Sequence, residues 1–344
     1  MEVMTQFSYL KPLHGVQLVE KPTPIPSNGA VRFTLPFTQV DQLTPFNSSA
    51  IWQLHDKGER YTTDISLFQQ NHAYQLAINC EGTGRFAFDQ QHMQVCWQPG
   101  GTGYEHYIQS TAIACWLELQ GVPCIHANAM CHDNDAFLFI APSRTGKSTL
   151  TTHLMQHGYQ MMTDDMAALH QVQQGCYQIY PSWPKIRLWP DSAQSLIGTK
   201  VDVTPQQVNP DSANNSAVNK VTVLAQKNVH AKFAKQELEL DTQQGTVWRQ
   251  TSAPLKAIYV LARSDNNAQQ CQIEQINASK AVILLLQNSM LANAYTNLGL
   301  ELQRLQWFAA LLSTVNVYKI SYKSGVQYLP QVCEHIKCHS KSLS

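Results

Sequence analysis

The segment at residues 141–149, Ala-Pro-Ser-Arg-Thr-Gly-Lys-Ser-Thr, constrains the fold of this chain more than any other feature. It follows an apolar stretch at residues 136–140 and precedes a stretch that is predicted to be helical to about residue 157. A short strand that is apolar at every position is typical of a strand buried on both faces. A buried strand, a glycine-containing loop and a helix, in this order, form the local context of a phosphate-binding loop.

The residue types in this loop suit the binding of nucleotide phosphates. Backbone N–H groups can surround phosphate oxygens, and the positive end of the following helix adds to the field. Gly146 allows close approach of the backbone, Lys147 neutralises phosphate charge, and Ser148 offers a hydroxyl to Mg²⁺. The GxxxxGK[ST] pattern begins with glycine, whereas this chain has Ala141 there. The predicted nucleotide-binding set also contains Ser143, Arg144, Thr145 and Thr149. The alternative is an incidental glycine and lysine before a helix.

A pair of adjacent carboxylates forms the second candidate. Asp164 and Asp165 follow a predicted strand at residues 159–163, and they lie 17 and 18 residues after Lys147. One short helix separates them from the loop, which predicts a neighbouring strand that ends beside the phosphates. A carboxylate in that position can bind Mg²⁺ or accept the proton of a hydroxyl. Adjacent residues at a strand end point to different sides, so the two can take different roles. Taken alone, an Asp-Asp pair is often only a helix cap.

Three further residues are weaker candidates. His126 lies 21 residues before Lys147 on a predicted short strand, where a histidine is more often structural. Lys185 and Arg187 lie two apart in a stretch rich in proline and tryptophan, which places them on one face of a strand. Two such cations can bind phosphate or transition-state charge, or they can be solvated basic residues.

The sequence resembles the HPr kinase/phosphorylase family and its relatives with the phosphoenolpyruvate-carboxykinase-like fold. The resemblance lies in the order and spacing of four elements, which are His126, the loop, Gly158 and the Asp164–Asp165 pair. The resemblance implies ATP and Mg²⁺ as cofactors and Asp164 as the base on the acceptor hydroxyl. It also implies Asp165 and Ser148 on the metal side, Lys147 at the phosphates and His126 near the base. The family's downstream E-I-R-G-L-G signature is replaced here by residues 181–191, which look like a variant subfamily of HPr-kinase-related proteins.

The predicted fold class is α/β (α+β), with a mixed-sheet P-loop kinase core. Residues 1–105 alternate like strands and predict a small β-rich N-terminal region. Residues 106–265 form the predicted core, which begins with an amphipathic helix and contains a polar loop at 199–220. That loop is either a lid over the substrate or a mobile insertion. Residues 266–344 are predicted to be a helical region packed on the core.

One helical face in this last region is expected to lie in the core, because apolar residues recur along it by fours and threes. The residues of this face are Leu298, Leu302, Leu305, Ala309 and Leu312.

Composition excludes several function classes. The chain has 24 Lys and Arg against 24 Asp and Glu, so it lacks the positive field of a typical nucleic-acid binder. The longest apolar run has six residues, whereas a membrane helix needs about 20. The nine cysteines are scattered and form no CxxC motif, and the first residues do not have the pattern of a signal peptide. These two features predict reduced thiols and a cytoplasmic location. Cys333 and Cys338, with His335 between them, could form a metal site, but no second ligand pair exists and they are interpreted as incidental thiols on a C-terminal helix.

The sequence therefore predicts an ATP- and Mg²⁺-dependent kinase that phosphorylates a serine-type hydroxyl of a protein or peptide. A kinase of a small-molecule hydroxyl and a nucleotide-binding regulatory protein with little turnover are the alternatives. We expect no nucleic-acid or membrane partner, and the oligomeric state stays open.

Overall fold

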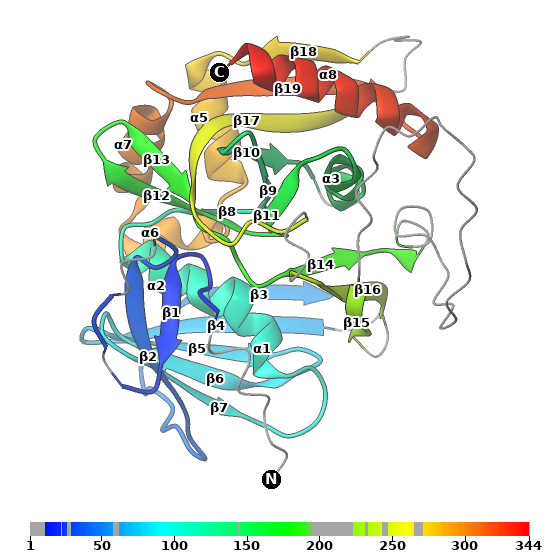
Figure 1. The fold of residues 1–344 in the computed structure, drawn as a ribbon. Coiled ribbons are helices and arrows are strands. Elements are labelled where there is room, and N and C mark those ends of the chain that lie inside the picture. Colours follow the sequence, from blue (N-terminus) through cyan, green and yellow to red (C-terminus); the bar gives the residue numbers. More distant parts are fainter. Residues whose placement is uncertain are drawn as a thin grey trace, which may run out of the picture.

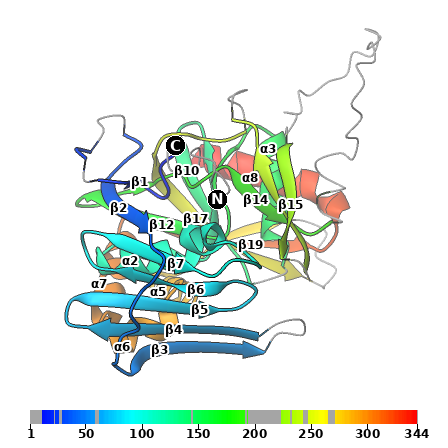
Figure 2. The ribbon, with the colours of Figure 1, turned by 90° about the horizontal axis from the view of Figure 1, so that it is seen from below.

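The computed structural model describes residues 11–21, 23–25, 29–57, 62–142, 145–190, 193, 223–230, 233–242, 247–264 and 271–343. Ser143, Arg144 and the polar loop at 199–220 lie outside the described residues. The described chain is a mixed α/β structure with three sheets, shown in Figures 1 and 2.

The N-terminal region forms a sheet of seven strands in the order β1-β2-β7-β6-β5-β4-β3. Every second side chain is buried along its inner strands, for example Phe86 and Phe88, or Leu76 and Ile78. This alternation is the period of two that predicted strands here, because successive side chains point to opposite faces. The strands are β1 (Val16–Val19), β2 (Phe33–Gln39), β3 (Ala50–Lys57), β4 (Thr62–Gln70), β5 (Ala73–Asn79), β6 (Thr83–Phe88) and β7 (Met93–Trp97).

A buried helical segment connects this sheet to the rest of the molecule (Figure 1). It consists of α1 (Tyr104–Tyr107), a π-helical turn (Ile108–Ala112) and α2 (Ile113–Leu119). The sequence predicted one amphipathic helix here, but α2 is buried on all sides from Ile113 to Glu118. It is buried all round because it packs between the N-terminal sheet and the start of the second sheet, whose residues share one apolar cluster with it.

The second sheet has nine strands and is mixed. Strand β10 pairs antiparallel with β9 and parallel with β17, and β17 is also parallel to β19. The carboxyl ends of β10, β17 and β19 therefore lie at one edge. The strands are β8 (Cys124–Ile125), β9 (Ala127–His132), β10 (Asp135–Ile140), β11 (Gln160–Thr163), β12 (Ala167–Gln173), β13 (Cys176–Ile179), β17 (Ala253–Ser264), β18 (Gln272–Gln275) and β19 (Asn316–Lys323).

Helices cover both faces of this sheet. Phe137 and Phe139 of β10 lie in the cluster with α3 and α8, whereas Leu138 and Ile140 lie in the cluster with α5 and α7. The expectation of a strand buried on both faces is therefore confirmed. These helices are α3 (Lys147–Gln156), α5 (Ala278–Gln287), α7 (Glu301–Leu311) and α8 (Leu329–Ser342), and the short α6 (Tyr295–Leu298) precedes α7.

The prediction that the leucine face of the C-terminal region lies in the core is wrong for three of its five residues, whereas Leu298 and Leu312 are partly buried against the apolar clusters. Leu302 and Leu305 of α7 keep 65% and 45% of their surface exposed, and Ala309 is exposed as well. Leu298 belongs to α6, which ends at the left-handed Gly299, so the five residues do not share one helix. The buried residues of α7 are instead Arg304, Phe308 and Leu311. The helix is turned this way because a buried carboxylate elsewhere in the chain binds Arg304.

A third, small sheet lies beside the phosphate-loop segment, in the order β14-β16-β15. Its strands are β14 (Lys185–Leu188), β15 (Val223–His230) and β16 (Phe233–Leu240). Within the described parts of the chain, no helix has both the length and the apolar character that crossing a membrane requires.

Candidate functional site

The predicted phosphate loop connects β10 to α3. Strand β10 ends at Ile140 and α3 begins at Lys147, so the described residues have the predicted order of strand, loop and helix. Gly146 caps the helix with φ of 90° and ψ of 20°, a left-handed conformation that glycine adopts without strain. The N–H of Leu150 donates to the carbonyl of Gly146 at 2.9 Å, which closes the first helical turn. The side chain of Lys147 is buried at the start of this helix.

Arg263 adds a second cation to the loop, and sequence reasoning missed it. Its Nε donates to the Thr145 carbonyl at 2.7 Å. A Cβ at position 146 would lie 2.3 Å from the Arg263 Nη2, so the guanidinium lies directly over Gly146. Arg263 reaches this place because β10 and β17 are parallel and end at the same edge.

Asp164 joins the start of α3 to β14. The Ser148 hydroxyl donates to Asp164 Oδ1 at 3.3 Å, and the backbone N–H of Arg187 donates to Asp164 Oδ2 at 2.7 Å. The carboxylate is thus held by donors on both oxygens at the end of β11. The predicted neighbourhood of Ser148 and the aspartate pair is present in the structure, and the residue that contacts Ser148 is Asp164.

Asp165 faces other partners from a left-handed turn with φ of 65°. Aspartate tolerates this conformation better than most residues. Its N–H donates to Oδ1 of the buried Asn128 at 3.1 Å, and Asn128 Nδ2 donates to the Thr151 hydroxyl on α3 at 2.9 Å. Asn128 therefore links the aspartate turn to the phosphate-loop helix. Sequence reasoning missed it because an asparagine inside a strand carries no local signal.

Lys185 and Arg187 share one face of β14, as predicted, with Ile186 and Leu188 buried on the other. Both cations bind Glu237 of β16, which is 4% exposed. Lys185 Nζ lies 3.5 Å from Glu237 Oε1, and Arg187 Nε lies 3.2 Å from Glu237 Oε2. Arg187 Nη1 also lies 3.7 Å from Asp165 Oδ2. Arg187 therefore contacts both aspartates, one through its backbone and one through its side chain.

His126 lies in the gap between β8 and β9. Strand β8 pairs antiparallel with β12, and the last pair of this ladder is Ile125 with Ala167. His126 is therefore one residue beyond the ladder, at the end where the chain enters β12 from Asp165. Its backbone N–H donates to the Asn288 carbonyl at 2.8 Å, and the residue is half-buried. The backbone thus brings His126 to the same end of the sheet as the aspartates.

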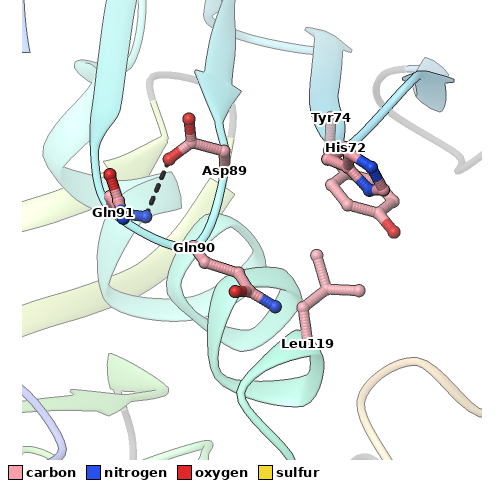
Figure 3. Close-up of a pocket in the computed structure, with 6 residues that line it drawn as sticks. All are labelled: His72, Tyr74, Asp89, Gln90, Gln91 and Leu119. Atoms are coloured by element: carbon pink, nitrogen blue, oxygen red, sulfur yellow. Dashed lines mark hydrogen bonds between the residues drawn. The ribbon is translucent and has the colours of Figure 1, made fainter.

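Two cavities lie away from the phosphate loop. One of about 310 Å³ is open between the turns of the N-terminal sheet and the end of α2, and Figure 3 shows Asp89 there, bound to the Gln91 N–H at 2.7 Å. It contains none of the predicted site residues. The other has about 100 Å³ and is lined by Pro181, Ser182, Pro184 and Trp248 among others, next to the start of β14. Its volume is below the roughly 300 Å³ at which pockets for small ligands begin.

The fold and the site define a mixed α/β protein with a lysine-, serine- and aspartate-containing cluster at the start of a helix. No family model matches this chain, and the search of curated proteins also found no match. Among solved structures, the HPr(Ser) kinase/phosphatase from Coxiella burnetii is similar with a TM-score of 0.31 and 12% identity, over 64% of this chain and 97% of that one.

Proposed function

We propose that this protein is an ATP- and Mg²⁺-dependent kinase of the HPr-kinase-like type, which transfers the γ-phosphoryl group to a serine-type hydroxyl of a protein or peptide. The observation that carries the proposal is the hydrogen bond between Ser148, in the first turn of α3, and Asp164, at the end of β11. The buried Lys147 precedes Ser148 at the start of the same helix. A lysine, a hydroxyl and a carboxylate therefore occur together at this helix N-terminus, and phosphoryl transfer from a nucleotide uses these three groups.

The phosphates would bind at the amino end of α3. The N–H groups at the start of a helix attract anions, and the Arg263 guanidinium lies over Gly146 at this same end of α3. Lys147 and Arg263 supply positive charge from two different elements. Ser148 and the aspartates offer the oxygen ligands that Mg²⁺ prefers, so the residues present fit this ion. When bound, Mg²⁺ would neutralise charge on the β- and γ-phosphates.

The two aspartates can divide the remaining work. We assign proton acceptance from the acceptor hydroxyl to Asp164, whose orientation is fixed by Ser148 and by the Arg187 N–H. Asp165 is assigned to the metal side together with Ser148. Because Asp164 is the residue that contacts Ser148, it also borders the metal position. His126 completes the assignment at the same end of the sheet, near the base.

Lys185 and Arg187 act in this proposal around the γ-phosphoryl group. Both are oriented by Glu237, which leaves them as a fixed pair of cations and not as mobile surface side chains. A preorganised cation stabilises developing negative charge without reorganising during the reaction. Arg187 contacts both aspartates, which supports a role for this residue next to the proposed base.

The proposal is tested with the purified full chain, Mg²⁺-ATP and a set of hydroxyl acceptors that includes peptides and small molecules. Transfer is measured as acceptor phosphorylation, and nucleotide affinity is measured separately by titration. We expect Lys147→Ala to lower ATP affinity. Asp164→Asn should keep nucleotide binding and lower transfer by about 10²- to 10⁴-fold, the usual contribution of a general base.

Asp133→Asn, in the exposed turn between β9 and β10, is the matched control and should behave as wild type. Unchanged ATP affinity in Lys147→Ala would refute the phosphate loop. Asp165→Asn should instead raise the Mg²⁺ concentration needed for activity. If Asp164→Asn shows that metal effect and Asp165→Asn loses transfer, the two roles are exchanged.

A further inference from the structure

We propose that His153, His157 and Cys333 form a binding site for a zinc-type transition-metal ion that joins α3 to α8. One ligand atom from each of the three residues lies within 4.8 Å of the other two. The site belongs to neither the phosphate loop nor the aspartate pair, and it does not depend on the proposed kinase activity.

The two histidines are arranged by the helix itself. His153 lies in the last turn of α3 and His157 is the C-cap residue four positions later, a spacing at which side chains are neighbours on one helix face. Their ring centroids are 4.7 Å apart. Cys333 approaches from α8, which contacts α3 and shares its apolar cluster through residues such as Leu154 and Ile336. The thiol is therefore brought to the histidines by core packing.

The histidine nitrogens are already disposed as in metal sites. Nδ1 of His157 lies 2.8 Å from the carbonyl of His153. Because a carbonyl only accepts, Nδ1 carries the proton and Nε2 of the neutral ring has the free lone pair. A ligating histidine typically donates its other N–H to a carbonyl or carboxylate in this way. Both ring nitrogens of His153 are buried, and neither has a hydrogen-bond partner among the described residues. A bound ion would satisfy one of them.

The thiol of Cys333 supplies the third ligand. The residue is 2% exposed. A neutral thiol in such a place becomes a thiolate when a cation takes the position of its proton, which is then released to solvent. Two imidazoles and one thiolate suit zinc and similar ions, whereas Mg²⁺ and Ca²⁺ take oxygen ligands. Three protein ligands would leave the fourth position of a tetrahedral ion to a water molecule.

The test uses the full chain, freed of metal with a chelator and titrated with Co²⁺, which reports its ligands by absorption. We expect one Co²⁺ per chain, visible bands of a tetrahedral ion, a thiolate-to-cobalt charge-transfer band in the near ultraviolet, and displacement by Zn²⁺. Cys333→Ser should lose the charge-transfer band and weaken binding by at least 10-fold. His157→Gln should weaken binding by a similar factor, and since this position is half-exposed the variant is expected to fold.

Cys338→Ser is the matched control, because Cys338 is exposed on the same helix. A control is needed since the chain has 13 histidines and nine cysteines. Zn²⁺ should raise the thermal unfolding midpoint of wild type and of Cys338→Ser but not of Cys333→Ser. A wild-type chain that binds no Co²⁺, or a Cys333→Ser variant that keeps the charge-transfer band, overturns the proposal. The two proposals can fail separately. If the chain binds Co²⁺ but does not bind ATP, the kinase proposal is refuted and the metal site is not.

Discussion

Replacing Arg304 by methionine should destabilise this protein more than most single substitutions. Arg304 of α7 and Glu118 of α2 are both fully buried. Arg304 Nε donates to Glu118 Oε2, and Nη2 donates to the Glu118 carbonyl, each at 2.5 Å. Glu118 Oε1 in turn accepts from the Cys124 N–H at 2.8 Å and from the Tyr295 hydroxyl at 2.9 Å. One carboxylate thus joins three separate elements.

The expected loss follows from these contacts. Arg304→Met removes two hydrogen bonds that involve a charged group, each contributing about 1.5 to 3 kcal/mol. It also leaves the Glu118 carboxylate buried without its cation, and breaking a buried pair in this way costs about 3 to 5 kcal/mol. The second figure already includes the two lost hydrogen bonds, so we expect the free energy of unfolding to fall by about 3 to 5 kcal/mol in total. Removing both charges, as Glu118→Gln with Arg304→Met, should recover part of this loss because no unpaired charge remains.

The dependence on pH gives a second signature. Burial raises the pKa of Glu118, and Arg304 opposes that shift. Without Arg304 the folded-state pKa rises further above the unfolded value of about 4.3, so the folded state binds the proton more tightly. The deficit of Arg304→Met should then grow as the pH rises past the folded-state pKa of Glu118 in wild type, which itself lies above the unfolded value.

Urea unfolding followed by tryptophan fluorescence measures these differences, and the slope of each transition shows whether the states compared are the same. Leu302→Ala, on the exposed side of α7, is the control and should change stability by no more than about 0.5 kcal/mol. The reasoning is refuted if Arg304→Met loses less than about 1 kcal/mol, or if the double variant is no more stable than the single one.

Three further outcomes are expected. Burial lowers the pKa of His170 to about 3, so below about pH 6.5 this histidine takes up a proton in the unfolded state but not in the folded state. The free energy of unfolding should therefore fall by about 2 kcal/mol between pH 7 and pH 5 because of His170. In urea unfolding, His170→Asn should remove this part of the pH dependence. Asn128→Ala breaks its bond to the Asp165 N–H and should lower the free energy of unfolding by about 2 kcal/mol; an unchanged urea midpoint would contradict the role of Asn128. Gly146→Ala must adopt φ of 90° and meet Arg263, so ATP affinity in a titration should drop at least 10-fold, about 1.4 kcal/mol, and equal affinity would show that the loop tolerates a side chain.

Much of the local structure was predictable from the sequence. The buried strand, the loop and the helix that begins after Gly146 are encoded within about twenty consecutive residues, and the structure has them in that order. The position of the aspartate pair near the loop was predicted from chain length, because one short helix and one strand return the chain to the loop. The residue that contacts Ser148 is Asp164, whereas the sequence resemblance grouped Asp165 with Ser148. Lys185 and Arg187 share a face because side chains alternate along any strand.

The parts that were missed depend on pairing over long distances. Arg263 reaches the loop only through the parallel register of β17 with β10, and Glu237 reaches the two cations only through the register of β16 with β14. A strand pattern shows which side chains share a face but not which strand lies next to it. The approach of Cys333 to the two histidines likewise depends on how α8 packs on α3.

The helix α7 shows the limit most directly. Its amphipathic pattern was correctly interpreted as a helix, yet its leucine side faces outward and Arg304 faces inward. The deciding partner is Glu118, which lies 186 residues earlier in the chain. The sequence by itself determined the local period of each element, because that period depends on neighbouring residues. Only the tertiary structure decided which face was buried, because that depends on a charge brought in by the rest of the fold.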